Sequence, residues 1–160
     1  MSVATADLAD DYADVIQCCD LQMRNFGAVA SFSGPIRTVR CCEDIALLKR
    51  AVQELGDGAV LVVDAGGSMH KAVLGDQLAK TAEQNGWAGI VLNGVVRDSS
   101  ILRTIGIGVK AMGSTPSRGT ETGAGDTNVA VTFGGVTFTP GDQLFADEDG
   151  VIVLPAGTVG

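Results

Sequence analysis

The residues with the clearest potential for chemistry are two aspartates and an arginine. Asp76 lies in the stretch "GDQL", and after twenty intervening residues Arg97 and Asp98 stand together in "GVVRD". A carboxylate with water ligands is a common protein site for Mg²⁺ or Mn²⁺, so Asp98 is a candidate metal ligand. Asp76 adds a second negative charge, which we expect to act through a metal-bound water. A guanidinium binds a carboxylate through two parallel hydrogen bonds, which makes Arg97 a candidate substrate-binding residue.

The stretch "GDQL" offers a second way to hold an anion. Because the first N–H groups of a helix lack intrahelical partners, the backbone of Gly75, Asp76, Gln77 and Leu78 is a candidate carboxylate site. An anionic oxo-acid beside a divalent ion suggests a definite reaction, in which the ion acts as a Lewis acid and stabilises the enolate formed when a carbon–carbon bond breaks. The expected cofactor is therefore Mg²⁺ or Mn²⁺, and the expected substrate is a small oxo-acid.

Each of these residues also has a purely structural interpretation. Asp98 precedes "SSIL" and is a good helix N-cap. Asp76 falls in the first turn of a predicted helix, where the helix dipole favours an acid. Arg97 could simply pair with a nearby carboxylate. Local sequence leaves both interpretations open.

Alternating strands and helices must position these residues. Apolar runs predict strands at 59–65, 88–94 and 107–113, with helices at 75–86 and 98–106 between them. Strands of this kind are typical of a parallel sheet covered on both faces, so the pattern predicts a βαβαβ core. Ligands of such sheets bind beyond the carboxyl ends of the strands, where "DAGGS", "GVVRD" and "GDQL" should meet.

Further elements flank this core. A helix is expected from Thr5 to about Ala13, and residues 27–42 predict two strands around a turn at Gly34–Pro35. The next predicted helix has four apolar residues on one face: Ile45, Leu48, Val52 and Leu55. Short strands near the C-terminus predict a mainly antiparallel sheet. Because no linker or repeat divides residues 1–160, we expect a single α/β domain with three layers, β, β and α.

Composition argues against several classes of function. Eleven basic and nineteen acidic residues give a net charge of -8, and no Lys/Arg cluster offsets it, so direct nucleic-acid binding is not expected. The N-terminus lacks the features of a signal peptide and no apolar run could span a membrane, so a cytoplasmic location is expected. The four cysteines form two adjacent pairs, which suit neither a zinc site nor a CxxC motif. We interpret them as reduced.

Five longer motifs resemble the RraA family, named as regulators of ribonuclease activity A. They are "CDLQMRNFG", "SGPIRTVRC", "VLVVDAGGS", "FGGVTFTPGD" and "ADEDGVIVLP". The motifs follow the family's order, and the resemblance runs from about residue 6 to 155. It implies a swivelling β/β/α domain that assembles into homotrimeric rings, which some members double to hexamers.

The family contains two functional types. One binds the endonuclease RNase E and inhibits it, acting on protein and not on RNA. The other comprises the class II 4-hydroxy-4-methyl-2-oxoglutarate aldolases, which also decarboxylate oxaloacetate. Members of the aldolase type carry an aspartate, twenty residues and then Arg-Asp, as Asp76, Arg97 and Asp98 do here, whereas the founding regulators keep the arginine and lack both acids. The resemblance therefore favours a metal-dependent lyase, with regulation of RNase E as the alternative.

The resemblance also implies a role for each matching residue. The backbone amides of residues 75–78 would bind substrate, and Arg97 would hold its carboxylate and keto oxygen. Asp98 would ligate the metal, and Asp76 would hold a metal-bound water that can move protons. A faint similarity of "VLVVDAGGS" to the glycine-rich motif of S-adenosylmethionine-dependent methyltransferases fails on the glycine spacing after Asp64, so that class is not expected.

Overall fold

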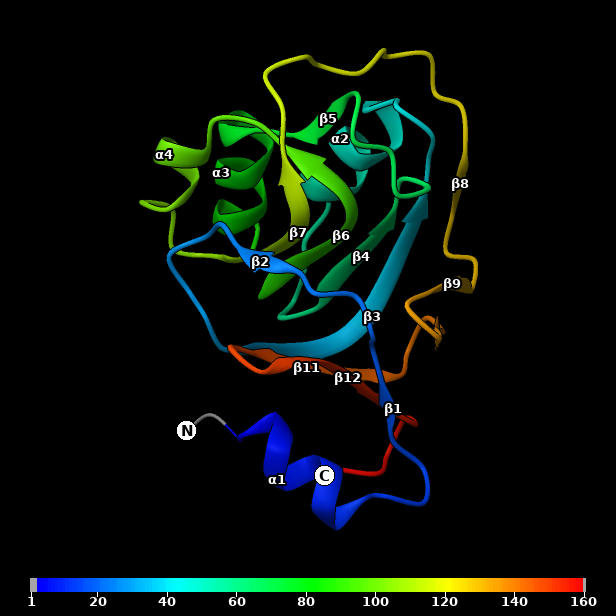
Figure 1. The fold of residues 1–160 in the computed structure, drawn as a ribbon. Helices are drawn as coiled ribbons and strands as arrows, with labels where there is room; N and C mark the ends of the chain where they lie inside the picture. The colour runs from blue at the N-terminus through cyan, green and yellow to red at the C-terminus, as the bar shows by residue number, and fades with distance from the viewer. Residues whose placement is uncertain (1–2, 160) are drawn as a thin grey trace.

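The computed structural model describes residues 3–159, and four parallel strands form its centre (Figure 1). In spatial order these strands are β3 (Phe32–Arg40), β4 (Val60–Asp64), β6 (Gly89–Val96) and β7 (Gly108–Ser114). Each neighbouring pair is parallel. The crossovers contain the helices α2 (Ala46–Gln53), α3 (Asp76–Gln84) and α4 (Ser99–Leu102). The predicted α/β fold with a parallel core is therefore confirmed.

The C-terminal strands extend this sheet on its β3 side. The strands β11 (Gln143–Asp147) and β12 (Gly150–Leu154) pair antiparallel, as predicted, and β11 pairs with the first half of β3. The strands β9 (Val131–Phe133) and β10 (Val136–Phe138) form a separate antiparallel pair. Four short strands attach to the main sheet: β1 (Gln17–Cys18), β2 (Arg24–Asn25), β5 (Ala72–Leu74) and β8 (Asp126–Thr127). The result is one large mixed sheet.

Strand β3 corrects the prediction of a turn at Gly34–Pro35, because it runs unbroken through both residues. Up to Pro35 it pairs with β11, and from Ile36 onward it pairs with β4. A Cβ at position 34 would lie 2.0 Å from the carbonyl oxygen of Gly58. The glycine therefore permits a close approach of two chain segments, and the proline stands where the strand changes partner.

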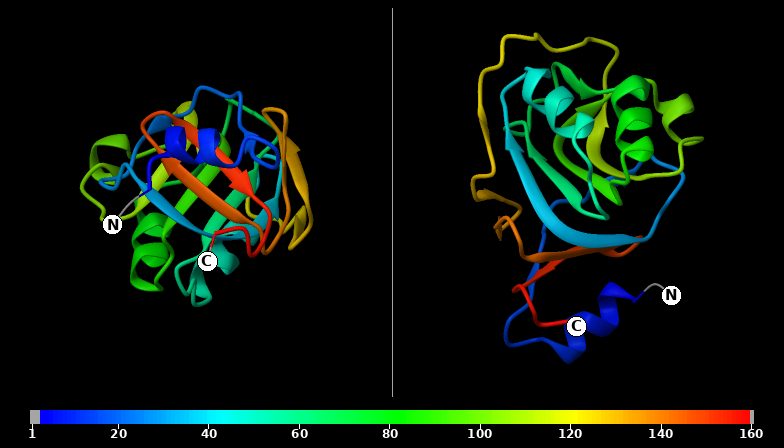
Figure 2. Two further views of the ribbon diagram at one scale, coloured as in Figure 1. Left: turned by 90° about the horizontal axis from the view of Figure 1, so that it is seen from below. Right: turned by 180° about the vertical axis from the view of Figure 1, so that it is seen from behind.

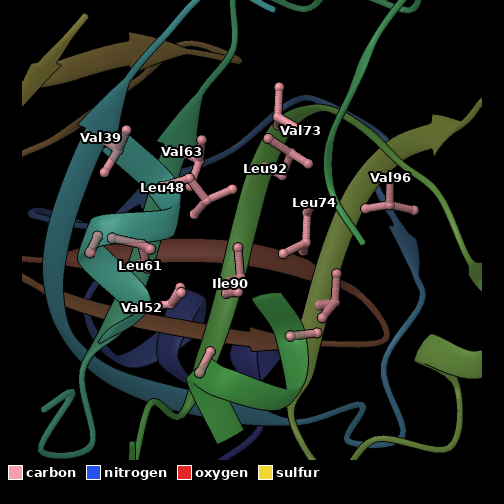
Figure 3. Packing of buried hydrophobic residues seen from close by; sticks show 14 of the residues in the cluster. Val39, Leu48, Val52, Leu61, Val63, Val73, Leu74, Ile90, Leu92 and Val96 are labelled. Atoms are coloured by element: carbon pink, nitrogen blue, oxygen red, sulfur yellow. The ribbon is translucent and has the colours of Figure 1, made fainter. Parts of the chain in front are cut away.

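The continuous apolar runs are explained by a hydrophobic cluster on each face of the parallel strands. In β4, Leu61 and Val63 face the helices, where they join Leu48 and Val52 of α2 (Figure 3). The alternate residues of β4 face the opposite way and pack with the C-terminal strands, in a cluster that includes Phe138. Because both faces of β4 are buried, the strand shows no polar alternation.

The prediction that one face of α2 carries the buried apolar residues is confirmed in part. Leu48 and Val52 are fully buried, but Leu55 is 76% exposed. The helix ends at Gln53, and Glu54 is already extended, so Leu55 no longer follows the helical period. No helix within residues 3–159 is both long and apolar enough to cross a membrane.

Helix α1 (Thr5–Asp11) lies beyond the C-terminal strands, on the far side of the molecule from α2 and α3 (Figure 2). Its Leu8 packs against Ile152 and Leu154 of β12. The backbone N–H and the hydroxyl of Thr5 donate to the carboxylate of Asp147, at 2.8 and 2.7 Å. These contacts dock the predicted N-terminal helix onto the outer face of the sheet.

Candidate active site

The predicted site residues line one cleft of about 250 Å³ where β5 and β6 end and α3 begins. Gly75, Asp76, Gln77, Leu78, Arg97 and Asp98 all contribute to its wall. The expected third segment, "DAGGS" after β4, is not among the lining residues. Its place is taken by β5, a short strand that the sequence analysis missed. Strands β5 and β6, both labelled in Figure 1, pair in parallel. Because Leu74 pairs with Val96, the residues that follow them, Gly75 and Arg97, lie beside each other.

A change of partner in β6 creates this arrangement. The strand pairs with β4 through Asn93, and its last two residues, Val95 and Val96, pair with β5 instead. Between these two parts, the register against β7 shifts. Irregularities of this kind bend a strand and redirect the side chains that follow. The redirected end of β6 carries Arg97 and Asp98 to the start of α3.

The side chain of Asp98 caps a helix, but not the one that follows it in sequence. Its Oδ2 accepts a hydrogen bond from the backbone N–H of Asp76, the first residue of α3, at 3.1 Å. It makes no side-chain cap to its own helix α4, and its backbone has a left-handed conformation, with φ of 59°. Asp98 therefore occupies the predicted N-cap position of α4, where its carbonyl accepts from Ile101 and Leu102, but its side chain does not cap that helix. Non-glycine residues in this conformation are uncommon and often mark functional sites.

Gly75 makes this contact possible. A Cβ built at position 75 would lie 2.7 Å from Oδ2 of Asp98 and 3.5 Å from Nε of Arg97. The backbone here is extended, with φ of -132°, so the glycine is not needed for its conformational freedom. What the site requires is space, because any larger residue would push the two charged side chains away from α3.

The structure also bears on the ion-pair interpretation of Arg97. The backbone N–H of Arg97 donates to the carbonyl of Leu74 at 2.9 Å, which holds the residue against β5. Within residues 3–159, no carboxylate lies within 4.0 Å of its guanidinium nitrogens. The side chain lines the cleft and is partly buried. Its charge is therefore available to an anion in the cleft.

The first turn of α3 forms the opposite wall. Asp76 is largely buried and lies 3.7 Å from Nζ of Lys80, one helical turn later. Its backbone N–H is occupied by Asp98, whereas the N–H groups of Gln77 and Leu78 belong to the turn that has no intrahelical acceptors. Leu78 also packs against the helix-side core. Gln77 and Leu78 both line the cleft, and their N–H groups have no acceptor within the helix.

The donor set fits a hard, hydrated cation. Asp98 has a second carboxylate oxygen, Oδ1, to which no hydrogen bond is found in the described part of the chain. No cluster of three or more His, Cys, Asp or Glu side chains occurs in residues 3–159, so a closed zinc-type site is absent there. Mg²⁺ and Mn²⁺ differ from zinc in this respect, because one or two carboxylates plus water and substrate oxygens satisfy them. Asp98, with Asp76 nearby, meets that requirement.

Two cations in the cleft were missed by sequence reasoning. Lys49 of α2 and Arg118 of the long loop after β7 both line it, and Glu121 contacts both of them. The sequence places these residues in a helix and a polar loop, and no spacing connects them. The helical period offered one signal, since Lys49 lies one turn after the buried Ile45, which also lines the cleft.

A buried aspartate holds this loop in place. Asp44, just before α2, is 1% exposed and accepts hydrogen bonds from the N–H and hydroxyl of Thr122, the hydroxyl of Thr120 and the N–H of Gly123. Burial acts to raise the pKa of its carboxyl, but the hydrogen bonds from Thr122, Thr120 and Ala46 outweigh this and hold the pKa well below its usual range. Asp44 therefore remains ionised and fixes the loop that carries Arg118.

Solved structures of several bacterial proteins share the fold along nearly the whole chain. A protein from Geobacillus kaustophilus HTA426, described as S-adenosylmethionine: 2-dimethylmenaquinone methyltransferase, is 41% identical with a TM-score of 0.96, over 98% of this chain and 97% of its own. The RNA-processing inhibitor RraA from Thermus thermophilis is also 41% identical with a TM-score of 0.96, over 100% and 97%. Streptomyces coelicolor RraAS2, from the RNase ES inhibitor RraA family, is 30% identical with a TM-score of 0.76, over 97% and 81%.

The Geobacillus and Thermus proteins carry different functional names at the same 41% identity, so identity alone does not select an activity. A family model agrees with the recognition made from the motifs: the one described as RraA-like, Aldolase/RraA, matches residues 5–153. This family includes both metal-dependent aldolases and inhibitors of RNase E. With the match covering nearly every residue of the sheet and the cleft, the chain belongs to the RraA-like family.

Proposed function

We propose that this chain is a divalent-metal-dependent lyase that acts on pyruvate-yielding oxo-acids. Its reactions would be the cleavage of 4-hydroxy-4-methyl-2-oxoglutarate and the decarboxylation of oxaloacetate. The observation that carries the proposal is the cleft itself, where residues 3–159 provide no hydrogen-bond donor to Oδ1 of Asp98 and no carboxylate within 4.0 Å of the guanidinium nitrogens of Arg97.

Different residues of the cleft would bind the substrate and the cation. Arg97 would hold the substrate carboxylate and its keto oxygen, with the N–H groups of Gln77 and Leu78 on the other side. Asp98 would hold the cation, and Asp76 would stay close through a water. When bound there, Mg²⁺ or Mn²⁺ would supply Lewis-acid stabilisation of negative charge on the keto oxygen.

Both reactions break the bond between C3 and C4 of the oxo-acid. In the aldol cleavage the C4 hydroxyl loses its proton, one pyruvate departs, and the bonding electrons remain on the other half as an enolate. In the decarboxylation CO₂ departs and the same enolate remains. Protonation at C3 then yields pyruvate. A water held by Asp76 is the nearest candidate to accept the first proton and return it, which needs no Schiff-base lysine.

Metal-dependent turnover tests this proposal. Purified protein is assayed for release of pyruvate from oxaloacetate and from 4-hydroxy-4-methyl-2-oxoglutarate with Mg²⁺ or Mn²⁺, before and after chelation. Asp98→Ala should abolish the metal-dependent rate, and Arg97→Ala should raise KM with some loss of kcat. Arg103→Ala, an exposed arginine outside the cleft, is the matched control. An unchanged rate in Asp98→Ala would rule the proposal out.

A second candidate function is inhibition of RNase E by direct protein contact. The observation that favours it is the 41% identity with the Thermus protein described as an RNA-processing inhibitor. Calorimetric titration with the RNase E of the same organism would decide the matter, and no detectable binding at roughly tens of micromolar would end it. An Asp98→Ala variant that binds RNase E normally but has lost lyase activity would separate the two functions.

The methyltransferase description of the Geobacillus protein receives no support from the loop that such enzymes use. Oδ1 of Asp64 accepts hydrogen bonds from the N–H of Gly66 and the side-chain amide of Asn93, both at 3.0 Å. The glycines after Asp64 also lack the spacing of the methyltransferase motif. S-adenosylmethionine binding measured by calorimetry provides the check, and we expect none.

We further propose that the chain forms homotrimers, with hexamers as pairs of rings. The support is membership of the RraA-like family. Light scattering coupled to gel filtration measures the assembled mass directly. A monomer across the working concentration range would contradict this proposal, without bearing on the residues of the cleft.

A further inference from the structure

The cleft contains a second charged group, away from Arg97 and Asp98, which the proposed reaction does not use. We call it the cationic pair: Lys49 and Arg118, with Glu121 between them. Oε2 of Glu121 lies 3.3 Å from Nζ of Lys49, and Oε1 lies 2.6 Å from a guanidinium nitrogen of Arg118. Both cations line the cleft, and Glu121 does not. The group therefore carries a net positive charge facing the cleft.

The backbone fixes the distance between the cationic pair and Arg97, the residue proposed to hold the first carboxylate. Arg118 is bridged to Ala72, the first residue of β5, through hydrogen bonds from Ala72 N–H to Ser117 and from Gly119 N–H to the carbonyl of Ala72. Gly75, beside Arg97, follows three residues later. At roughly 3.3 Å per strand residue the two points are about 10 Å apart along β5. Long side chains reaching inward from both ends leave room for a short acid between them.

The ion pairs of Glu121 with Lys49 and Arg118 contribute too little to the stability of the fold to explain why these charges lie together. All three side chains are between 41% and 47% exposed, and ion pairs in such positions contribute little to folding. Glu121 makes one contact with each cation, whereas a guanidinium has five N–H donors and an ammonium has three. Donors therefore remain for a ligand, and the Asp44 hydrogen bonds to Thr120 and Thr122 hold the loop on either side of Glu121.

We infer that the cationic pair is a specificity site for a second carboxylate, at the end of the substrate far from Arg97. This inference rests on the proposed function in taking Arg97 as the site of the first carboxylate. The ligand class is a 2-oxo dicarboxylate with a chain of about five carbons. In the aldol cleavage the distal carboxylate stays on the departing oxo-acid, so a cation that holds it does not oppose bond breaking.

Two stable acids of equal chain length isolate the distal carboxylate. They are 2-oxoglutarate, which has it, and 2-oxopentanoate, which ends in a methyl group. Neither has a C4 hydroxyl, so neither undergoes the aldol cleavage, and binding is measured by calorimetry with Mg²⁺ present. We expect the wild-type protein to bind 2-oxoglutarate about 10- to 100-fold more tightly, the range for a charge-assisted hydrogen bond. Arg118→Ala should remove that preference and leave 2-oxopentanoate binding unchanged.

Matched variants separate specificity from structural damage. Arg118→Lys should retain part of the preference because it keeps the charge, and Arg103→Ala should retain all of it. Thermal unfolding checks that each variant is folded, and Lys49→Gln, which should reduce the preference, replaces Arg118→Ala if the latter does not fold. Equal binding of the two acids by the wild-type protein, no binding of either, or equal weakening of both in Arg118→Ala would overturn the inference.

The same measurements keep this inference apart from the proposed function. If the protein has no lyase activity but prefers 2-oxoglutarate through Arg118, the dicarboxylate site stands and the reaction is wrong. If it cleaves oxo-acids but shows no preference, the reaction stands and the role of the cationic pair is wrong.

Discussion

Asp44 and Asp98 are both acids close to the start of a helix, but they differ in how many hydrogen bonds their carboxylates accept. Asp98 directly precedes α4 as its N-cap residue, and Asp44 stands two residues before the first residue of α2, whose N-cap is Ile45. Asp44 does bond the N–H of Ala46 at the start of its own helix, and its two oxygens accept four more hydrogen bonds from a distant loop. Within residues 3–159 the carboxylate of Asp98 accepts one hydrogen bond, from Asp76, and the residue lines the cleft.

The difference shows how a carboxylate becomes available for chemistry. The lone pairs of Asp44 are saturated by donors of the protein, so that residue can only hold structure together. Asp98 has one oxygen that fixes its position and another that is free for a cation. A left-handed backbone at Asp98 and the missing side chain of Gly75 are the local features that keep it so.

The largest effect should come from Asp98→Asn. Asparagine keeps an oxygen for the N–H of Asp76 but removes the negative charge that would hold a divalent cation. We expect lyase turnover to fall by about 100- to 1,000-fold, a loss of several kcal/mol of transition-state stabilisation. The temperature of thermal unfolding should remain close to that of the wild-type protein. A large loss of stability would break the comparison, because Asp98 would then resemble Asp44.

The reverse is expected of Asp44→Asn. The amide group of asparagine would face donors such as the N–H of Thr122, so buried hydrogen bonds would be lost. The free energy of unfolding should fall by about 2–4 kcal/mol, as measured by urea denaturation. Preserved stability would contradict the view that this carboxylate fixes the loop.

The pH dependence of stability sharpens the contrast further. The pKa of Asp44 is lowered in the folded protein, so its contribution is fully present above the unfolded value of about 3.9 and is lost as pH falls toward the folded value. The stability difference between wild type and Asp44→Asn should therefore shrink below about pH 4. Urea denaturation of both proteins at a series of pH values measures it, and a difference that stays constant down to about pH 2.5 would be inconsistent with this assignment.

Asp147 should show the same behaviour on the other side of the molecule. Burial acts to raise its pKa, but hydrogen bonds from Thr5 and from the N–H groups of Asp149 and Gly150 lower it. Acidification should therefore release α1 as well. The measurement is the protection of the amides of residues 5–11 against hydrogen exchange, taken relative to the intrinsic exchange rate at each pH. We expect this protection to fall below about pH 4.

The smallest effect should come from Gly75→Ala. The new methyl group would lie 2.7 Å from Oδ2 of Asp98, so that side chain must move away from α3. We expect a loss of about 1–2 kcal/mol in stability, measured by urea denaturation, and a severalfold rise in KM for oxaloacetate. Unchanged KM would mean that the position of Asp98 matters less than the comparison with Asp44 implies.

Much of the core could be predicted from the sequence because it depends on period and residue type over short stretches. The run "VLVV" in β4 indicated a strand buried on both faces, and both faces are buried. The prediction failed at Gly34–Pro35, where residues typical of a turn serve a close approach between distant segments. It failed again at Leu55, because a helix end is decided by packing as much as by pattern.

The sequence by itself determined the family, the parallel core and the spacing of Asp76, Arg97 and Asp98. Only the tertiary structure decided which acid is saturated and which is free. The loop residues that donate to Asp44 lie 76 to 79 residues away, and the donor to Asp98 lies 22 residues away on a different helix. The bend of β6, the short strand β5 and the loop that carries Arg118 bring these groups together. Hydrogen bonds depend on distances in space, and no local pattern records them.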